Sequence, residues 1–148
     1  MSAGADTAGL YQRALVERSR RPLHAGRPEH FDAEAHRDNP LCGDRITVFI
    51  RLGADGTVAE ARFEARGCAV FLASADLMAE AVTGLARDEA GRTCAGFLGF
   101  AHGMDAELPA AALLAPLAGV REYPGRISCA TMPWEALAAA LAEGRQAA

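Results

Sequence analysis

The residues best suited to chemistry lie in the segment NPLCGDR, residues 39–45. A thiol and a carboxylate stand two residues apart there, and the glycine between them allows a tight turn. Two more cysteines, Cys68 and Cys129, can complete a set of four ligands. A closed zinc site takes four tetrahedral ligands, chiefly thiolate, imidazole and carboxylate. The residue types therefore predict a zinc site made of Cys42, Asp44, Cys68 and Cys129, with a reactive thiolate.

The spacing of the cysteines leaves a second interpretation open. No two of them are separated by two residues, so no zinc-ribbon pattern applies. Cysteine is also a common core residue, so three buried structural thiols would fit the same pattern. The fourth cysteine, Cys94, stands among apolar and glycine residues, and we expect it to be a core thiol rather than a resolving cysteine.

A predicted hairpin explains how the first two cysteines can meet. Residues 45–52 are rich in β-branched residues with alternating apolar positions, and residues 58–63 form a second strand. The turn at residues 53–56 contains Asp and Gly, which tolerate the positive φ of tight hairpin turns. Cys42 precedes the first strand and Cys68 follows the second, so an antiparallel hairpin brings them together.

Helices are expected over most of the remaining chain. The spacing of apolar residues predicts helices at residues 6–20, 69–85 and 130–143. Residues 86–125 are expected to be helical with breaks, with one helix at about 109–121 and a turn at 123–125. Trp134, Leu137 and Leu141 are the predicted core face of the last helix. Residues 22–40 are polar and are expected to form a loop with one short edge strand near 30–36. The three histidines in that loop could share one side of a strand, but such histidines are usually solvated.

Both later cysteines fall near predicted helix starts. Cys68 lies at a helix N-terminus, where free N–H groups and the helix dipole favour a thiolate. Cys129 follows Arg126 by three residues, and this arginine is a candidate to hold a thiolate or an incoming anion beside the ligands. The basic end of the first helix, residues 18–21, fits either helix capping with a solvated face or a docking surface.

Length and composition limit the class of protein. A chain of 148 residues with 51% apolar and 23% charged residues predicts one globular domain, residues 1–148, with frayed ends at 1–5 and 144–148. A net charge of −4 argues against a general nucleic-acid binder. Neither a signal peptide nor a membrane span is visible, which predicts no membrane association and a cytoplasmic location. Cysteines in that compartment favour metal binding or catalysis over disulfides.

Three motifs carry a resemblance to a known family. They are residues 39–46 (NPLCGDRI), 63–68 (FEARGC) and 126–131 (RISCAT), followed by Trp134 and Leu137. In this order they resemble the SufU-type proteins of the IscU/NifU-like iron–sulfur cluster assembly superfamily, and the resemblance covers about residues 10–142. IscU-type chains carry a histidine before the third cysteine, where this chain has Ser128. The 60 residues between Cys68 and Cys129 fit the longer segment of SufU-type chains.

The resemblance implies an α+β fold, with a small antiparallel sheet of about three strands packed against several helices. It also implies a zinc-dependent sulfurtransferase with Asp44 as the fourth ligand and Cys42 as the sulfur acceptor. Its expected partners are a SufS-type PLP-dependent cysteine desulfurase and downstream Suf scaffold proteins. Two alternatives are an iron–sulfur scaffold that holds a transient cluster on the same cysteines, and a non-catalytic zinc-containing activator of the desulfurase.

Two positions depart from the family pattern. The family often has Asp-His in the first helix where this chain has Glu17-Arg18. Phe71 is bulkier than the small residue usual after the second cysteine. Neither residue is a proposed ligand, but both are expected to alter partner docking.

Overall fold

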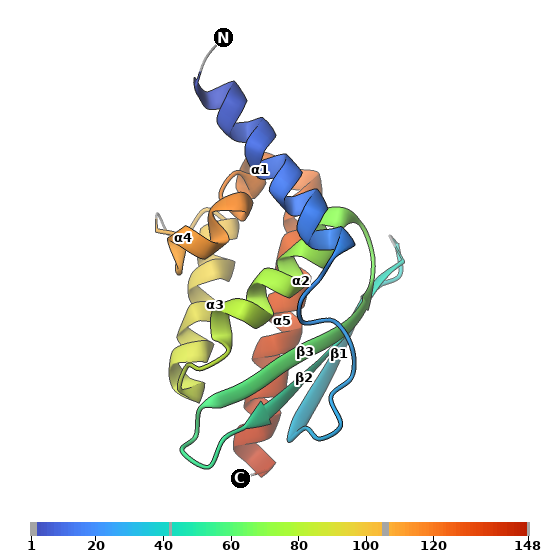
Figure 1. The fold of residues 1–148 in the computed structure, drawn as a ribbon, viewed down its shortest axis with the longest axis vertical. Helices are drawn as coiled ribbons and strands as arrows, with labels where there is room; N and C mark the ends of the chain where they lie inside the picture. Colours follow the sequence, from blue (N-terminus) through green and yellow to red (C-terminus); the bar gives the residue numbers. More distant parts are fainter. Residues whose placement is uncertain (1–2, 42, 105–106, 148) are drawn as a thin grey trace.

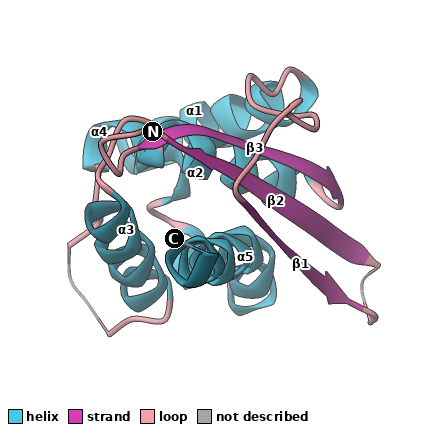
Figure 2. Ribbon diagram, turned by 90° about the horizontal axis from the view of Figure 1, so that it is seen from below, coloured by secondary structure: helices cyan, strands magenta, loops and turns pink. Residues whose placement is uncertain are grey.

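The structure, a computed structural model, describes residues 3–41, 43–104 and 107–147. Its helices pack on one face of a three-stranded antiparallel sheet (Figures 1 and 2). The elements follow in the order α1 (Ala3–Arg20), β1 (Ala33–Asn39), β2 (Asp44–Leu52), β3 (Val58–Arg66), α2 (Ala69–Val82), α3 (Arg87–Ala101), α4 (Ala111–Leu114), η1 (Ala115–Leu117), η2 (Val120–Glu122) and α5 (Pro124–Ala147). This arrangement confirms the expected α+β fold. None of the helices in these ranges is long and apolar enough to cross a membrane.

The sheet has the order β1-β2-β3, with both neighbouring pairs antiparallel. Along β2, Ile46, Val48 and Ile50 are buried on one face, as alternation along a strand requires. The predicted β2–β3 hairpin is confirmed, and the edge strand β1 lies about three residues later than expected. Because β1 and β2 also pair, the segment between residues 39 and 44 is itself a hairpin turn. Asp44, a predicted ligand and the first residue of β2, therefore lies at the end of the sheet.

The apolar core lies between the sheet and the helices α2, α3 and α5. Trp134 of α5 is fully buried and stacks on Phe97 of α3 with ring centroids 4.4 Å apart. Leu137 and Leu141 are also buried, so the predicted core face of the last helix is confirmed. Cys94 of α3 is 1% exposed, which confirms that it is a core thiol.

The helical boundaries differ from the prediction in two places. The turn expected at residues 123–125 is the first turn of α5, because proline fits the first helical position, where its missing N–H is not needed. Cys129 therefore lies in the second turn of α5 instead of near the start of a helix. The helix expected at 109–121 is wrong as a single element, since it is divided into α4, η1 and η2. Pro116 and Gly119 lie at these breaks and disfavour a continuous helix.

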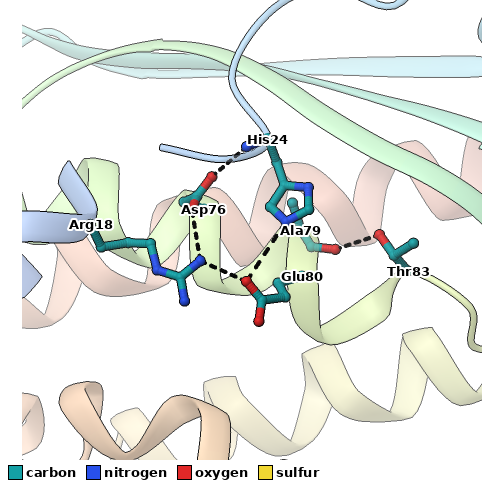
Figure 3. A network of polar contacts seen from close by, with 6 residues as sticks. All are labelled: Arg18, His24, Asp76, Ala79, Glu80 and Thr83. Carbon is teal, nitrogen blue, oxygen red and sulfur yellow. Dashed lines mark hydrogen bonds and ion pairs between the residues drawn. The ribbon is translucent and has the colours of Figure 1, made fainter. Parts of the chain in front are cut away.

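A partly buried charged network attaches α1 to α2 (Figure 3). Arg18 of α1 contacts the carboxylates of Asp76 at 2.9 Å and Glu80 at 2.6 Å. The side chain of Asp76 is fully buried and also accepts a 2.7 Å hydrogen bond from the backbone N–H of His24. Arg18 is thus a structural residue that joins α1 to α2.

Candidate metal centre

Three of the four predicted ligands converge at one end of the sheet. One ligand atom from each of Asp44, Cys68 and Cys129 lies within 4.8 Å of the others. The Sγ atom of Cys129 is 3.8 Å from Oδ2 of Asp44, and both residues are 7% exposed. The fourth predicted ligand, Cys42, lies outside the described residues, between Leu41 and Gly43 of the same turn.

The turn before Asp44 is held by its own backbone and by Asn39. The N–H of Gly43 donates to the carbonyl of Asn39 at 2.8 Å, and the N–H of Leu41 donates to the Asn39 side chain at 3.0 Å. Gly43 has φ +76°, a conformation that residues with a side chain rarely adopt. Asp44 follows as the first residue of β2 and is directed to the buried face. The turn chemistry therefore fixes where this carboxylate lies.

Cys68 is the N-cap residue of α2, as its position at a strand-to-helix junction predicted. No side chain caps the first turn of this helix, so its first N–H groups have no side-chain acceptor at the N-cap. The residue before it, Gly67, is in close contact with two neighbours. A Cβ atom at this position would lie 2.8 Å from Cδ1 of Phe71 and 2.9 Å from Oδ1 of Asp44. The absence of a side chain at Gly67 allows Asp44 to approach Cys68.

Cys129 faces the other two ligands from α5. Burial, together with the neighbouring Cys68 and Asp44, raises the pKa of Cys129 to about 12, while the charge of Arg126 acts in the opposite direction. Arg126 is exposed in the first turn of α5, as expected for a cation beside the site. A metal that binds here would have to displace the proton of this thiol.

The donor set fits zinc. Sulfur and carboxylate oxygen are both zinc ligands, and a tetrahedral site with Zn–S bonds of about 2.3 Å separates two sulfurs by about 3.8 Å. The separations of up to 4.8 Å between the three atoms would need to contract by only about 1 Å. Cys94 is not part of this group of residues, and neither are the three loop histidines.

Two residues that position the site were not identified from the sequence. Ser74 of α2 donates a 2.6 Å hydrogen bond to the carbonyl of Ala130 in α5, and so links the helices that carry Cys68 and Cys129. Gly67 permits the close approach described above. One available signal was the pair of polar residues, Ser74 and Asp76, among the apolar residues in the middle of this helix.

A family model and two relatives of known name place this chain in the same group of proteins. A family model for the NifU-like N terminal domain matches residues 10–130. The iron–sulfur cluster assembly scaffold protein IscU of Streptococcus pyogenes serotype M1 is 33% identical over 136 residues, which cover 89% of this chain and 82% of the relative. The zinc-dependent sulfurtransferase SufU of Bacillus subtilis (strain 168) is 32% identical over 139 residues, which cover 93% of this chain and 92% of the relative.

A solved structure supports the same relationship. The crystal structure of FiSufU, described for the SUF system of Fervidobacterium islandicum AW-1, matches with a TM-score of 0.76 and 25% identity. The match covers 86% of this chain and 93% of that protein. The family model spans most of the chain, and two relatives exceed 30% identity over most of their length. This chain therefore belongs to the NifU-like N-terminal domain family of iron–sulfur cluster assembly proteins.

Proposed function

We propose that this protein is a zinc-dependent sulfurtransferase that accepts persulfide sulfur from a SufS-type cysteine desulfurase in the cytoplasm. The observation that carries the proposal is the convergence of Asp44, Cys68 and Cys129 beside the turn that contains Cys42. The similarity to a relative named as a zinc-dependent sulfurtransferase supports the same function. Zinc bound by these residues and Cys42 would keep the thiols deprotonated and protected from oxidation.

The transfer step is redox-neutral. The thiolate of Cys42 attacks the outer sulfur of the cysteine persulfide on the desulfurase. A new S–S bond forms at Cys42, the S–S bond on the desulfurase breaks, and the desulfurase cysteine leaves as a thiolate. The proton of the persulfide stays on the transferred sulfur. This sulfur can then pass to downstream Suf scaffold proteins by the same exchange.

Within this proposal the two ligands of the turn have different roles. Asp44 is a buried carboxylate held close by Gly67, and it would remain when Cys42 is released to react. Cys68 and Cys129 belong to α2 and α5, which a hydrogen bond connects, and they would act as fixed anchors. Arg126 would stabilise negative charge next to Cys129.

The test compares Cys42→Ala with the wild-type protein in the presence of the cysteine desulfurase. We expect the variant to lose persulfide formation, measured by mass spectrometry, and to lose its stimulation of alanine release. Metal content, measured by emission spectroscopy, is expected to be stoichiometric zinc in the wild type. Sulfur transfer through Cys42 is wrong if the variant retains zinc and still stimulates alanine release at the full rate.

The scaffold function is a second candidate, because the IscU relative of Streptococcus pyogenes is named as a scaffold. Thiolate-rich sites accept both zinc and iron. Anaerobic reconstitution with iron and sulfide separates the two functions, because a scaffold would give a coloured, oxygen-sensitive protein. A colourless protein that retains zinc would instead support the sulfurtransferase. A non-catalytic activator would stimulate the desulfurase without carrying persulfide on Cys42.

A further inference from the structure

Two arginines face each other next to the candidate metal centre, and neither has an acidic partner among the residues that the structure describes. Arg45 of β2 and Arg66 of β3 are directly opposed in the sheet register, and both side chains are exposed. Like charges at opposed positions destabilise a sheet. Acidic residues are close in the register, since Asp38 lies opposite Arg45 and Glu64 precedes Arg66 by two residues. Within the described ranges, however, neither arginine forms an ion pair with them.

The other arginines on this face of the sheet do have acidic partners. Arg51 and Arg62 both contact the carboxylate of Glu60, at 3.6 Å and 3.5 Å. The uncompensated charge is thus confined to the end of the sheet that carries the ligands. A chain with net charge −4 keeps two unpaired cations there at some cost to stability. Such local conflicts with folding rules are expected at functional surfaces.

The opposed arginines directly border the candidate ligands. Arg45 follows Asp44, Arg66 precedes Gly67 and Cys68, and all of them line one open hollow. Leu41, on the ligand turn, is 96% exposed and offers an apolar contact beside the two charges. A molecule that approaches Asp44 and Cys68 through this hollow would therefore meet an exposed leucine and two guanidinium groups.

We propose that Arg45, Arg66 and Leu41 form the docking surface for the protein that delivers sulfur, and that this protein presents carboxylates to the two arginines. This inference rests on the proposed function and specifies the chemistry by which the donor is recognised. A guanidinium group can donate two parallel hydrogen bonds to one carboxylate. Complementary charge on the two proteins also raises their association rate. The docking surface would place an acidic segment of the donor next to Cys42.

An acidic protein surface fits better than a small anion or a nucleic acid. Both arginines are exposed on an open hollow, so a small anion would remain largely hydrated there. The same sheet face also carries Asp38, Glu60 and Glu64, which would repel an extended polyanion. Discrete carboxylates on a protein, together with an apolar contact for Leu41, satisfy all of these features.

A double charge reversal tests the proposal. Arg45→Glu with Arg66→Glu is compared with Arg13→Glu and Arg92→Glu, two exposed arginines of α1 and α3. The two double variants have the same net charge, so a difference in their association with the desulfurase depends on where the charges lie. We expect the first to slow association with the desulfurase at low salt by about tenfold or more, and to raise KM for sulfur transfer without lowering kcat. The difference should largely disappear at about 0.5 M salt.

The single variant Arg66→Glu separates docking from folding. It places a carboxylate opposite Arg45, which is a favourable cross-strand pair, so the melting temperature should rise by about 1–4 °C. Affinity for the desulfurase should fall in the same variant. Leu41→Ser, at an exposed turn position, should weaken binding without changing the melting temperature.

Several outcomes would overturn the proposal. Equal losses in the two double variants would indicate a general effect of net charge. Weaker binding of inorganic phosphate, with unchanged affinity for the desulfurase, would assign the arginines to a small anion. Binding to the desulfurase is measured independently of sulfur transfer. If the wild-type protein binds through these arginines but carries no persulfide, the proposed function is wrong and the docking surface is supported.

Discussion

The indole N–H of Trp134 donates a 3.0 Å hydrogen bond to the hydroxyl of Ser74, and both side chains are fully buried. The same hydroxyl donates to the carbonyl of Ala130, one residue after the predicted ligand Cys129. Ser74 lies in α2, which begins immediately after Cys68. Pro133 cannot donate a helical hydrogen bond to the carbonyl of Cys129, so this part of α5 depends more on side-chain contacts. The hydroxyl of Ser74 thus connects the helices next to which Cys68 and on which Cys129 lie, the two cysteines proposed as metal anchors.

Replacing Ser74 with Ala should weaken both the fold and the metal centre. The indole N–H would remain buried without a partner, at a cost of about 1–3 kcal/mol in the free energy of unfolding. Zinc affinity, measured by competition with a chromophoric chelator, should fall, and the spectrum of the cobalt-substituted protein should change. Thr83→Ala is the control, because the hydroxyl of this C-cap residue donates to the carbonyl of Ala79 in the last turn of α2 and links no second helix in the described part of the chain. Equal effects in the two variants would show that the connection between α2 and α5 does not position the site.

Replacing Arg18 with Met should destabilise the protein by about 3 kcal/mol, measured by urea unfolding. The variant removes the charged partner of Asp76, whose carboxylate is fully buried. Arg21→Met is the control, since its 3.7 Å contact with Glu17 is exposed and should contribute less than about 0.5 kcal/mol. The double variant Arg18→Met with Asp76→Leu should regain much of the stability. A loss in Arg18→Met no larger than in the control would contradict a structural role for the network.

Replacing Gly67 with Ala should affect the metal centre more than the fold. The new methyl group would be under 3.0 Å from Phe71 and Asp44, so one of these side chains must move. We expect zinc affinity to fall while the unfolding transition of the metal-free protein changes little. Gly91→Ala in α3 is the control, because its methyl group would meet no atom within 4 Å. The control should gain about 0.5–1 kcal/mol in stability and bind zinc normally. Normal zinc affinity in Gly67→Ala would refute the role assigned to this glycine.

The sequence contained enough information to predict the β2–β3 hairpin and its consequence for the site. Alternating apolar residues along β2 and an Asp-Gly turn are local signals, and they determine that Cys68 returns toward the ligand turn. Such local signals make the approach of Cys68 to Asp44 predictable from the sequence. Ligation by Cys42 stays a prediction, because it lies outside the described residues.

Other features were not predictable, because their signals are either ambiguous or not local. Pro124 and Gly125 resemble a turn, yet they begin α5, since a proline fits both contexts. The pairing of Arg18 with Asp76 joins residues 58 positions apart, which no periodicity indicates. The direct opposition of Arg45 and Arg66 also became visible only with the register of the two strands.

Because Cys94 is buried, its reaction with a thiol reagent can report how much of a sample has unfolded. Burial raises the pKa of this thiol to about 12, so in the folded protein it is neither accessible nor a thiolate. An alkylating reagent applied to the native protein should therefore modify Cys94 only in molecules that have unfolded. In a peptide map, the labelled fraction of Cys94 measures unfolding within the same sample that reports persulfide on the other cysteines. Sulfane sulfur found on Cys94 would then identify material damaged during preparation.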